Sequence, residues 1–205
     1  FLNKKNNYHY LPIPVDKNIE KLKIYENKNQ ICDVFFSMSH GVNRGKLKKD
    51  KVDERHNFIT DLITECPNII FDIYGYKNRE PVWADDFYKV IVNSKMALNL
   101  TRGKPLKYLT SNRIASLIGN GLLTFIDKKT KLNNFFSNNE VVFYSSLKDL
   151  ANKINYYKSN DSSRIKIAKN GRKKYFDLFE CQKIADYIIS KSFDRDVPKI
   201  LKWME

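Results

Sequence analysis

Apolar residues in this chain occur in short continuous runs and in longer segments whose apolar positions lie three or four residues apart. Short runs are typical of buried strands, and the longer spacing is typical of amphipathic helices. The runs predict strands at residues 32–37, 69–74, 96–101, 122–126 and 141–144. The periodic segments predict helices at residues 52–65, 83–93, 147–157, 162–179 and 181–193, and a short helix at 132–136. This alternation predicts an α/β fold, a Rossmann-like parallel sheet with helices on both faces.

The segment from Met96 to Asp127 is the centre of this arrangement. It predicts a strand, a polar loop at 102–109, a helix and a further strand. Thr110 and Ser111 supply hydroxyl groups that can cap the start of the helix. No acidic residue lies between Asp86 and Asp127, although helix starts usually carry Asp or Glu. The helix start is therefore open to an anion such as a phosphate group. A basic surface loop beside an ordinary amphipathic helix is the alternative.

Ligands of open parallel sheets bind beyond the carboxyl ends of the strands. In this chain the loops at those ends are 39–49, 75–81, 102–111 and 128–131, and the first and third are the most basic. The candidate ligand-binding residues in or beside these loops are Ser39, Gly41, Arg44, Tyr74, Gly75, Arg102, Lys104, Thr110, Ser111, Asn112, Arg113 and Ser116. Arg113 has no carboxylate near it in the sequence, so we expect it to face a diphosphate. Core packing is the alternative for Tyr74, and a plain turn is the alternative for 39–44.

The charge of the chain points to anionic partners. Lys and Arg outnumber Asp and Glu by 37 to 23, which gives a net charge of +14. Nucleotides, nucleic acid and a membrane surface are the partner classes that such a charge favours. A hydrophobic content of 42% and an aromatic content of 13% exclude general disorder. No apolar run approaches the length that spans a bilayer, and no signal peptide opens the chain.

Metal and cofactor motifs are not found in the sequence. It contains neither a dinucleotide-binding fingerprint nor a Walker loop. The three histidines are too few and too dispersed for a metal cluster, and acidic pairs such as Asp85–Asp86 arise often by chance. We therefore expect no metal and no cofactor. Three widely spaced cysteines without a CxxC motif favour reduced thiols and a cytoplasmic location, and the charge also allows a peripheral position at a membrane surface.

The length of 205 residues predicts one domain with appendages. Residues 1–30 contain two prolines in an extended stretch and are expected to form a linker or an N-terminal extension from a missing N-terminal domain. Residues 31–193 are expected to form the Rossmann-like domain, and 194–205 a C-terminal tail. The tail is apolar after Pro198, so it either docks on another surface or folds back on its own domain. The first residue is Phe1, so a fragment of a longer polypeptide is expected.

Several motifs occur in the order and spacing of a known family. They are Lys95-Met-Ala-Leu-Asn-Leu-Thr101, Thr110-Ser-Asn-Arg113, Gly121-Leu-Leu-Thr124, Glu140-Val-Val-Phe-Tyr144, Leu147-Lys-Asp-Leu150 and Ile167-Ala-Lys-Asn-Gly171. Over residues 31–180 the chain resembles the C-terminal, donor-binding domain of GT-B glycosyltransferases (glycosyl transferases group 1), in particular the spore-maturation-protein-like group. In that family the helix after the basic loop faces the nucleotide sugar. Many relatives carry a Glu at the position of Ser116 that binds ribose hydroxyls, and this chain departs from them there.

The resemblance implies a nucleotide-sugar-dependent glycosyltransferase, of a type that needs no metal. The donor it implies is a nucleotide-diphosphate sugar (UDP-, GDP- or similar). The implied acceptor is a glycan, a lipid, a lipid-linked glycan or a protein, and the implied role is polysaccharide biosynthesis. The acceptor site and any general base are expected in the missing N-terminal domain of the same polypeptide, so no catalytic residue is assigned and this fragment alone is expected to be inactive. The alternatives are a non-catalytic basic nucleic-acid-binding or regulatory domain, and a degenerate transferase domain retained for assembly. A specific nucleic-acid partner is not expected.

Overall fold

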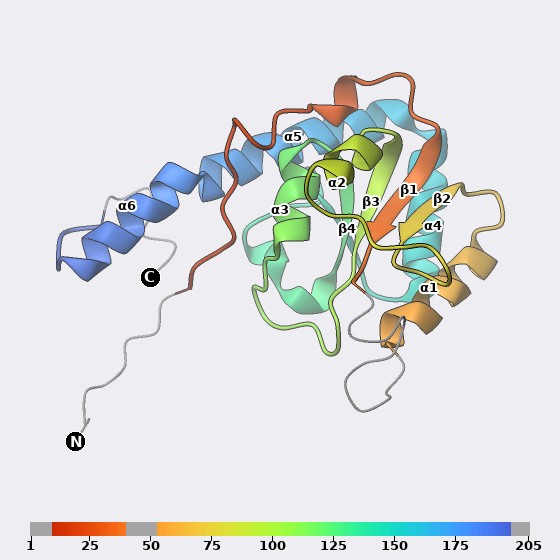
Figure 1. Cartoon of the computed structure of the whole chain (residues 1–205), viewed down its shortest axis with the longest axis horizontal. Helices are drawn as coiled ribbons and strands as arrows, with labels where there is room; N and C mark the ends of the chain where they lie inside the picture. Colours follow the sequence, from red (N-terminus) through yellow and green to blue (C-terminus); the bar gives the residue numbers. More distant parts are fainter. Residues whose placement is uncertain (1–9, 40–52, 198–205) are drawn as a thin grey trace.

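The computed structural model of the chain describes residues 10–39 and 53–197 (Figure 1). These residues form a five-stranded sheet in which every pair of neighbours is parallel. The strands are β1 (Cys32–Ser37), β2 (Phe71–Tyr74), β3 (Ser94–Asn99), β4 (Leu123–Asp127) and β5 (Val142–Tyr144), in the order β2-β1-β3-β4-β5. The predicted fold class is therefore confirmed. The predicted strand at 96–101 is displaced, because β3 begins and ends two residues earlier.

The helices follow the predicted segments closely. They are α1 (Glu54–Glu65), α2 (Ala84–Ile91), α3 (Asn112–Gly119), α4 (Leu147–Ser159), α5 (Asp161–Phe179) and α6 (Cys181–Ser192). Three short 3-10 helices are η1 (Ile24–Glu26), η2 (Lys128–Thr130) and η3 (Leu132–Asn134). The predicted helix at 132–136 is thus a single 3-10 turn. The start of α1 is set by Asp53, whose side chain accepts a hydrogen bond from the backbone N–H of Arg55.

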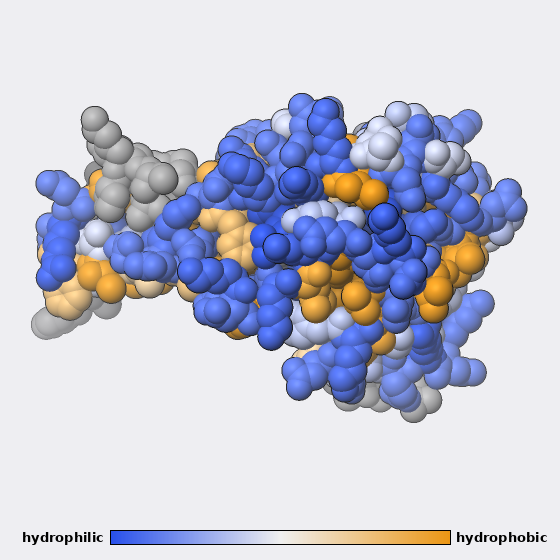
Figure 2. Space-filling model, turned by 90° about the horizontal axis from the view of Figure 1, so that it is seen from above, coloured by the Kyte–Doolittle hydropathy of each residue, from blue (hydrophilic) through white to orange (hydrophobic). Residues whose placement is uncertain are grey.

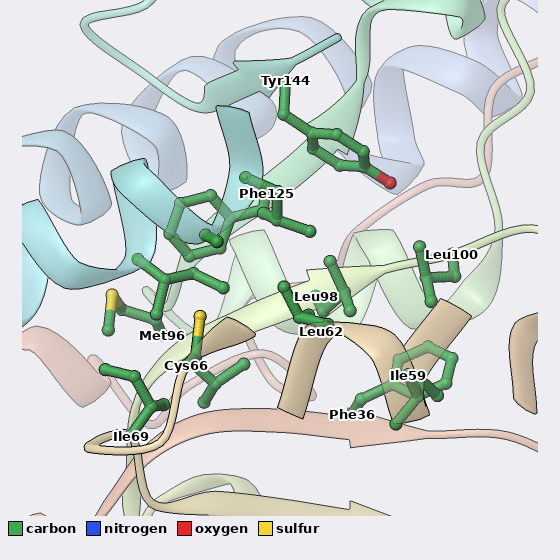
Figure 3. Close-up of a cluster of buried hydrophobic side chains, with 14 of the residues drawn as sticks. Phe36, Ile59, Leu62, Cys66, Ile69, Met96, Leu98, Leu100, Phe125 and Tyr144 are labelled. Carbon is green, nitrogen blue, oxygen red and sulfur yellow. The ribbon is translucent and has the colours of Figure 1, made fainter. Parts of the chain in front are cut away.

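Alternating residues of the strands build a core on each face of the sheet. On one face, Val34 and Phe36 of β1 pack with apolar residues of α1 and α4. The labelled residues of this cluster in Figure 3 are Phe36, Ile59, Leu62, Cys66, Ile69, Met96, Leu98, Leu100, Phe125 and Tyr144. On the other face, Phe35 packs with α2, and Ile114 and Ile118 of α3 pack with aromatic residues of α5. The helices therefore cover both faces, as expected for parallel strands.

The described part of the N-terminal segment packs along the domain. Val15 forms a parallel bridge with Glu180, donating to the carbonyl oxygen of Phe179 at 2.9 Å and accepting from the N–H of Cys181 at 2.9 Å. The Val15 and Ile24 side chains are buried. Residues 10–30, which the sequence assigned to a linker, therefore contribute to the core. At the other end, α6 extends beyond the sheet (Figure 1), and the apolar tail residues after Pro198 lie outside the described residues.

The surface is mostly hydrophilic, in agreement with the charge of the chain. Figure 2 shows hydrophilic residues over most of one face, with smaller hydrophobic areas between them. Among the described residues, helices long and apolar enough to cross a bilayer were not found.

Candidate functional site

A cavity of about 590 Å³ lies at the point where the order of strand addition changes from one side of β1 to the other. Strand β3 lies beside β1, although β2 follows β1 in the chain, and the helices after β1 and β3 cover opposite faces. The chain segments that follow β1 and β3 therefore lead to opposite faces of the sheet, and the space between them is the usual ligand position in such sheets. The cavity walls come from the end of β1, from Arg55 of α1, and from the first turns of α2 and α3.

Arg113 lies at the floor of this cavity and joins three elements. Its Nη1 donates to the carbonyl oxygen of Ser37 at 2.8 Å, and its Nη2 donates to that of Leu100 at 3.0 Å. The guanidinium carbon lies 4.9 Å from the centre of the Phe36 ring. The buried Nε has no hydrogen-bond partner among the described residues. Burial, followed by the nearby charge of Arg55, lowers the pKa of Arg113 to about 10, so the group remains charged at neutral pH.

A second arginine, Arg55, faces the same cavity. Its Nη2 lies 2.5 Å from Asp53 Oδ2 and 3.3 Å from the carbonyl oxygen of Ser39. Burial raises the pKa of Asp53, but the hydrogen bonds and charge of Arg55 outweigh it and hold the pKa below its usual value. Arg102 adds a third guanidinium, with Nε 3.8 Å from Asp53 and Nη2 3.4 Å from the Ser39 carbonyl. Three guanidinium groups thus lie around the end of β1, and one buried carboxylate, that of Asp53, lies among them.

Arg55 was not expected in the site, because its position inside a predicted helix is typical of an ordinary surface side chain. The pattern Asp53-x-Arg55 at the helix start was the signal in the sequence for this arrangement. An arginine two residues after a capping carboxylate can turn its guanidinium back to pair with that carboxylate. Arg55 is in fact buried. A buried arginine at the carboxyl end of a parallel strand is a candidate for binding an anion.

The first turn of α3 has the predicted cap. Ser111 Oγ accepts a hydrogen bond from the N–H of Ile114 at 3.3 Å, and the turn contains no acidic residue. Ser111 and the exposed Asn112 both line the cavity. Thr110 is not among the residues that line the described part of the cavity. It is buried, and its hydroxyl accepts a hydrogen bond from the N–H of Ile13 at 2.7 Å. Its predicted role in ligand binding is therefore corrected to holding the N-terminal segment.

Part of the cavity lining is aromatic, which was not expected from the sequence. Trp83, Phe87 and Tyr88 line it from the first turns of α2. Trp83 remains 63% exposed. The next residue, Ala84, has a positive φ of 47°, a backbone conformation that residues other than glycine rarely adopt. The sequence places these aromatics at a helix start, but only the fold brings them to the same cavity as the arginines.

Ser116 lines the cavity one helical turn after Arg113, as predicted. Tyr88 of α2 lines the same cavity. Residues three positions apart lie side by side on a helix, so a ligand group that contacts Ser116 would lie within one turn of the Arg113 guanidinium.

Two of the predicted residues lie elsewhere. Tyr74 and Gly75 end strand β2, and the described cavity wall includes neither. The Tyr74 ring is covered instead by the Arg79 guanidinium, whose carbon lies 3.7 Å from the ring centre. Gly75 has φ +75°, and a Cβ there would lie 1.8 Å from the Met38 carbonyl oxygen. Tyr74 therefore packs against Arg79 outside the described cavity wall, and its role in ligand binding stays a prediction, whereas Gly75 allows the close approach of the Met38 carbonyl.

The remaining predicted residues are accounted for as follows. Ser39 lines the cavity, Arg102 borders it through the Ser39 carbonyl, and Lys104 is exposed on the neighbouring loop. Gly41 and Arg44 lie outside the described residues. Within the described ranges, no group of three or more His, Cys, Asp or Glu side chains is placed to hold a metal ion.

Comparison with solved structures identifies the same fold. The structure of HepE from Anabaena in complex with UDP superposes with a TM-score of 0.65 at 13% identity, covering 88% of this chain and 56% of that chain. The HepE complex with UDP-glucose gives a TM-score of 0.62 at 13% identity and the same coverage. Sucrose-phosphate synthase from Thermosynechococcus elongatus gives 0.57 at 12% identity, covering 90% of this chain and 51% of that chain. The chain thus spans about half the length of these structures.

These neighbours are GT-B glycosyltransferase structures, so the Rossmann-like sheet of this chain matches a GT-B fold. No curated protein sequence matches the chain significantly. The sequence model of the glycosyl transferase-like family matches residues 54–190, which include α1, the whole of α3 and most of α6. The matched region is more than half of the chain, and therefore the chain belongs to the glycosyl transferase-like family.

Proposed function

We propose that this chain binds a nucleoside-diphosphate sugar and is the donor-binding part of a glycosyltransferase. The observation that carries the proposal is the composition of the cavity at the ends of β1 and β3. Its lining includes two arginines, Arg55 and Arg113, together with three aromatic residues, Trp83, Phe87 and Tyr88. A diphosphate fits the arginines, and a nucleoside, which offers a flat apolar face and hydroxyl groups, fits the aromatic residues.

The catalytic contribution of these residues would be electrostatic. Glycosyl transfer from such a donor leaves a nucleoside diphosphate, whose developing negative charge must be stabilised. Arg55, Arg113 and the acid-free start of α3 are preorganised for that charge by hydrogen bonds to the Ser37 and Ser39 carbonyls. We infer that the reaction needs no metal ion. Activity of the whole enzyme should accordingly persist in EDTA, and its loss with recovery on adding a divalent ion would contradict this inference.

The acceptor side of the reaction is proposed to lie in a further domain of the same polypeptide. This chain spans about half the length of its structural neighbours, which supports an incomplete active site. The acceptor would be a glycan, a lipid or a protein. Three cysteines that are free in the structure support a cytoplasmic location, and the charge of +14 supports a peripheral contact with an anionic membrane.

Calorimetric titration of the 205-residue chain tests the donor proposal. We expect UDP, GDP or a related nucleoside diphosphate to bind, and to bind more tightly than a single-stranded oligonucleotide of equal charge at physiological salt. Weak salt dependence is expected, because a confined site contacts only two phosphates. Tighter oligonucleotide binding with a steep salt dependence would instead support a nucleic-acid-binding domain. A matched control is Arg195→Met, which removes an exposed guanidinium remote from the cavity.

A further inference from the structure

Ile13 lines the cavity at the ends of β1 and β3, although it belongs to the N-terminal segment and not to the sheet or its helices. Its backbone N–H donates to Thr110 Oγ1 at 2.7 Å, and its carbonyl oxygen accepts from the Tyr175 hydroxyl at 3.1 Å. Thr110 directly precedes Ser111, the cap of α3, and Tyr175 lies on α5. The described segment therefore passes beside the start of α3 on its way to the end of α5 (Figure 1). Both polar backbone groups of Ile13 are thus held by residues that are distant in the sequence.

Two prolines restrict the backbone on either side of Ile13. Proline fixes its own φ and disfavours the helical conformation of the residue before it, so the stretch Leu11-Pro-Ile-Pro-Val15 favours an extended backbone. Neither proline has an N–H group, and Ile13 therefore has the only backbone donor between Leu11 and Val15. Val15 in turn pairs with the backbone of Phe179 and of Cys181, at 2.9 Å each. The Ile13 side chain is consequently presented to the cavity by a backbone with little remaining freedom.

The position of Ile13 determines what its side chain can do. The side chain is half-buried: it packs against the apolar cluster that contains Val15 and Ile114, and it also lines the cavity. Arg113, in the first turn of α3, lines the same cavity. An apolar side chain beside this helix start excludes water from a bound anion, and a lower local dielectric strengthens the hydrogen bonds between a guanidinium and a phosphate.

We propose that Ile13 is a ligand-contacting residue of this cavity, whose side chain covers a bound nucleoside diphosphate at the start of α3. This inference rests on the proposed donor binding. Thr110 and Tyr175 are positioning residues, because both are buried and act through the backbone of Ile13. The part of the chain that binds the donor therefore begins before residue 31, where the sequence placed the start of the domain, and before residue 54, where the family match begins.

Removal of the Ile13 side chain tests the contact. Calorimetry on the 205-residue chain first identifies which of ADP, CDP, GDP and UDP binds most tightly, and that nucleotide is the probe for every variant. We expect Ile13→Ala to weaken its binding about four- to tenfold, since the burial of one methylene group changes an equilibrium constant about fourfold. Ile13→Leu keeps the apolar volume and should recover most of the affinity. Ile19→Ala is the matched control, because Ile19 is 55% exposed in the same segment and is not among the residues that line the described cavity.

The two positioning residues are tested with variants that keep their shape. Thr110→Val removes the hydroxyl that accepts from the Ile13 N–H and should weaken binding of the probe about threefold, because Ile13 is then held less firmly. Thr110→Ser keeps the hydroxyl and should bind like the unaltered chain. Tyr175→Phe removes the hydrogen bond to the Ile13 carbonyl but keeps the buried ring, and should weaken binding in the same direction.

Amide exchange measured by NMR gives a readout that a purely structural role would not change. A single N–H, that of Ile13, reports on the stretch between the two prolines. If the ligand contacts Ile13, opening of the segment must break that contact, so a saturating concentration of the probe should slow exchange of this amide at least about threefold. The Ile19 N–H, hydrogen-bonded to the Asp16 carbonyl at 3.0 Å, is the control and should exchange at an unchanged rate.

Each outcome bears on a separate claim. Unchanged affinity of a folded Ile13→Ala variant would overturn this inference while leaving donor binding intact. Weaker binding by that variant without slower exchange of the Ile13 amide would assign the effect to packing between the segment and α3, and would overturn the inference as well. If no nucleoside diphosphate bound the unaltered chain, the proposed function itself would fail, and this inference with it. If Ile13→Ala does not fold, the exchange measurement on the unaltered chain decides, because it needs no substitution.

Discussion

Arg113 donates from Nη1 to the carbonyl oxygen of Ser37 at 2.8 Å and thereby ties the first turn of α3 to the end of β1. A second bond to Leu100 ties the same turn to the loop after β3. From the sequence, Arg113 was expected to face a diphosphate, because no carboxylate lies near it in the chain. The structure shows instead that its side chain joins the two strand ends while it lines the cavity.

Replacement of Arg113 should therefore reduce both stability and binding. We expect Arg113→Ala to lower the free energy of unfolding by about 1.5–3 kcal/mol, the scale of hydrogen bonds to a charged group, and to weaken nucleoside-diphosphate binding at least tenfold. Arg113→Lys should recover part of the affinity because it keeps the positive charge. It should not recover both hydrogen bonds to the Ser37 and Leu100 carbonyls, because an ammonium group lacks the planar, two-pronged donor geometry of a guanidinium. Urea unfolding and calorimetry on the same samples measure the two effects. A variant with unchanged unfolding would show that the carbonyl bonds contribute little.

Trp83 should contribute to binding but not to folding. Its side chain is 63% exposed at the cavity mouth, and an aromatic ring that stacks on a base contributes about 1–3 kcal/mol. Trp83→Ala should thus weaken nucleoside-diphosphate affinity by a factor of about 5–150, with an unfolding midpoint close to that of the unaltered chain. Phe193→Ala is the control, since Phe193 is 67% exposed beyond the end of α6. Equal affinities of the two variants would remove Trp83 from the site.

Two glycines with similar backbone angles should differ sharply in their tolerance of alanine. Gly75 has φ +75° and would place a Cβ 1.8 Å from the Met38 carbonyl oxygen, whereas Gly103 has φ +68° and open space around it. A left-handed conformation costs a residue with a side chain roughly 1–2 kcal/mol. Gly103→Ala should lose about that much stability, and Gly75→Ala clearly more, because Met38 must also move. Denaturant unfolding of both variants checks the order, which a similar loss in the two would contradict.

Asp33 should make the stability of the domain depend on pH. Its carboxylate is buried at the start of β1, 2.9 Å from Lys158 and 3.5 Å from Lys95. Burial alone would raise the pKa of Asp33, but the N–H of Ile70 and the two lysines outweigh it and lower the pKa. A lowered pKa in the folded state stabilises the fold above the unfolded-state value of about 3.9, and this contribution disappears as the pH falls through the folded-state pKa.

Asp33→Asn tests this directly. At pH 7 the variant should be less stable by about 1–3 kcal/mol, and the difference from the unaltered chain should shrink as the pH is lowered below about 4. Asp86→Asn is the control, because the Asp86–Lys89 pair is 71% and 72% exposed and such pairs contribute little. Urea unfolding from pH 3 to pH 7 gives the comparison. A stability difference that is independent of pH would assign the effect of Asp33 to packing.

The sequence by itself determined the elements, because the signals for them are local. Apolar runs defined the five strands, and the hydroxyl of Ser111 marked the start of α3 within one residue. The segment without acidic residues around Arg113 lies at the end of the sheet that carries the cavity, and its role in binding stays a prediction. These features depend on residues a few positions apart, so periodicity and capping chemistry suffice to find them.

The tertiary structure alone decided which side chains meet at that end. Arg55, Trp83 and Arg113 are far apart in the chain, and the order β2-β1-β3 brings their segments around one cavity. The same order moved Tyr74 out of the site, because β2 lies at the edge of the sheet, beyond β1. Strand order and the burial of Glu20 against Gly119 arise from packing between distant segments, for which a single sequence carries no local pattern.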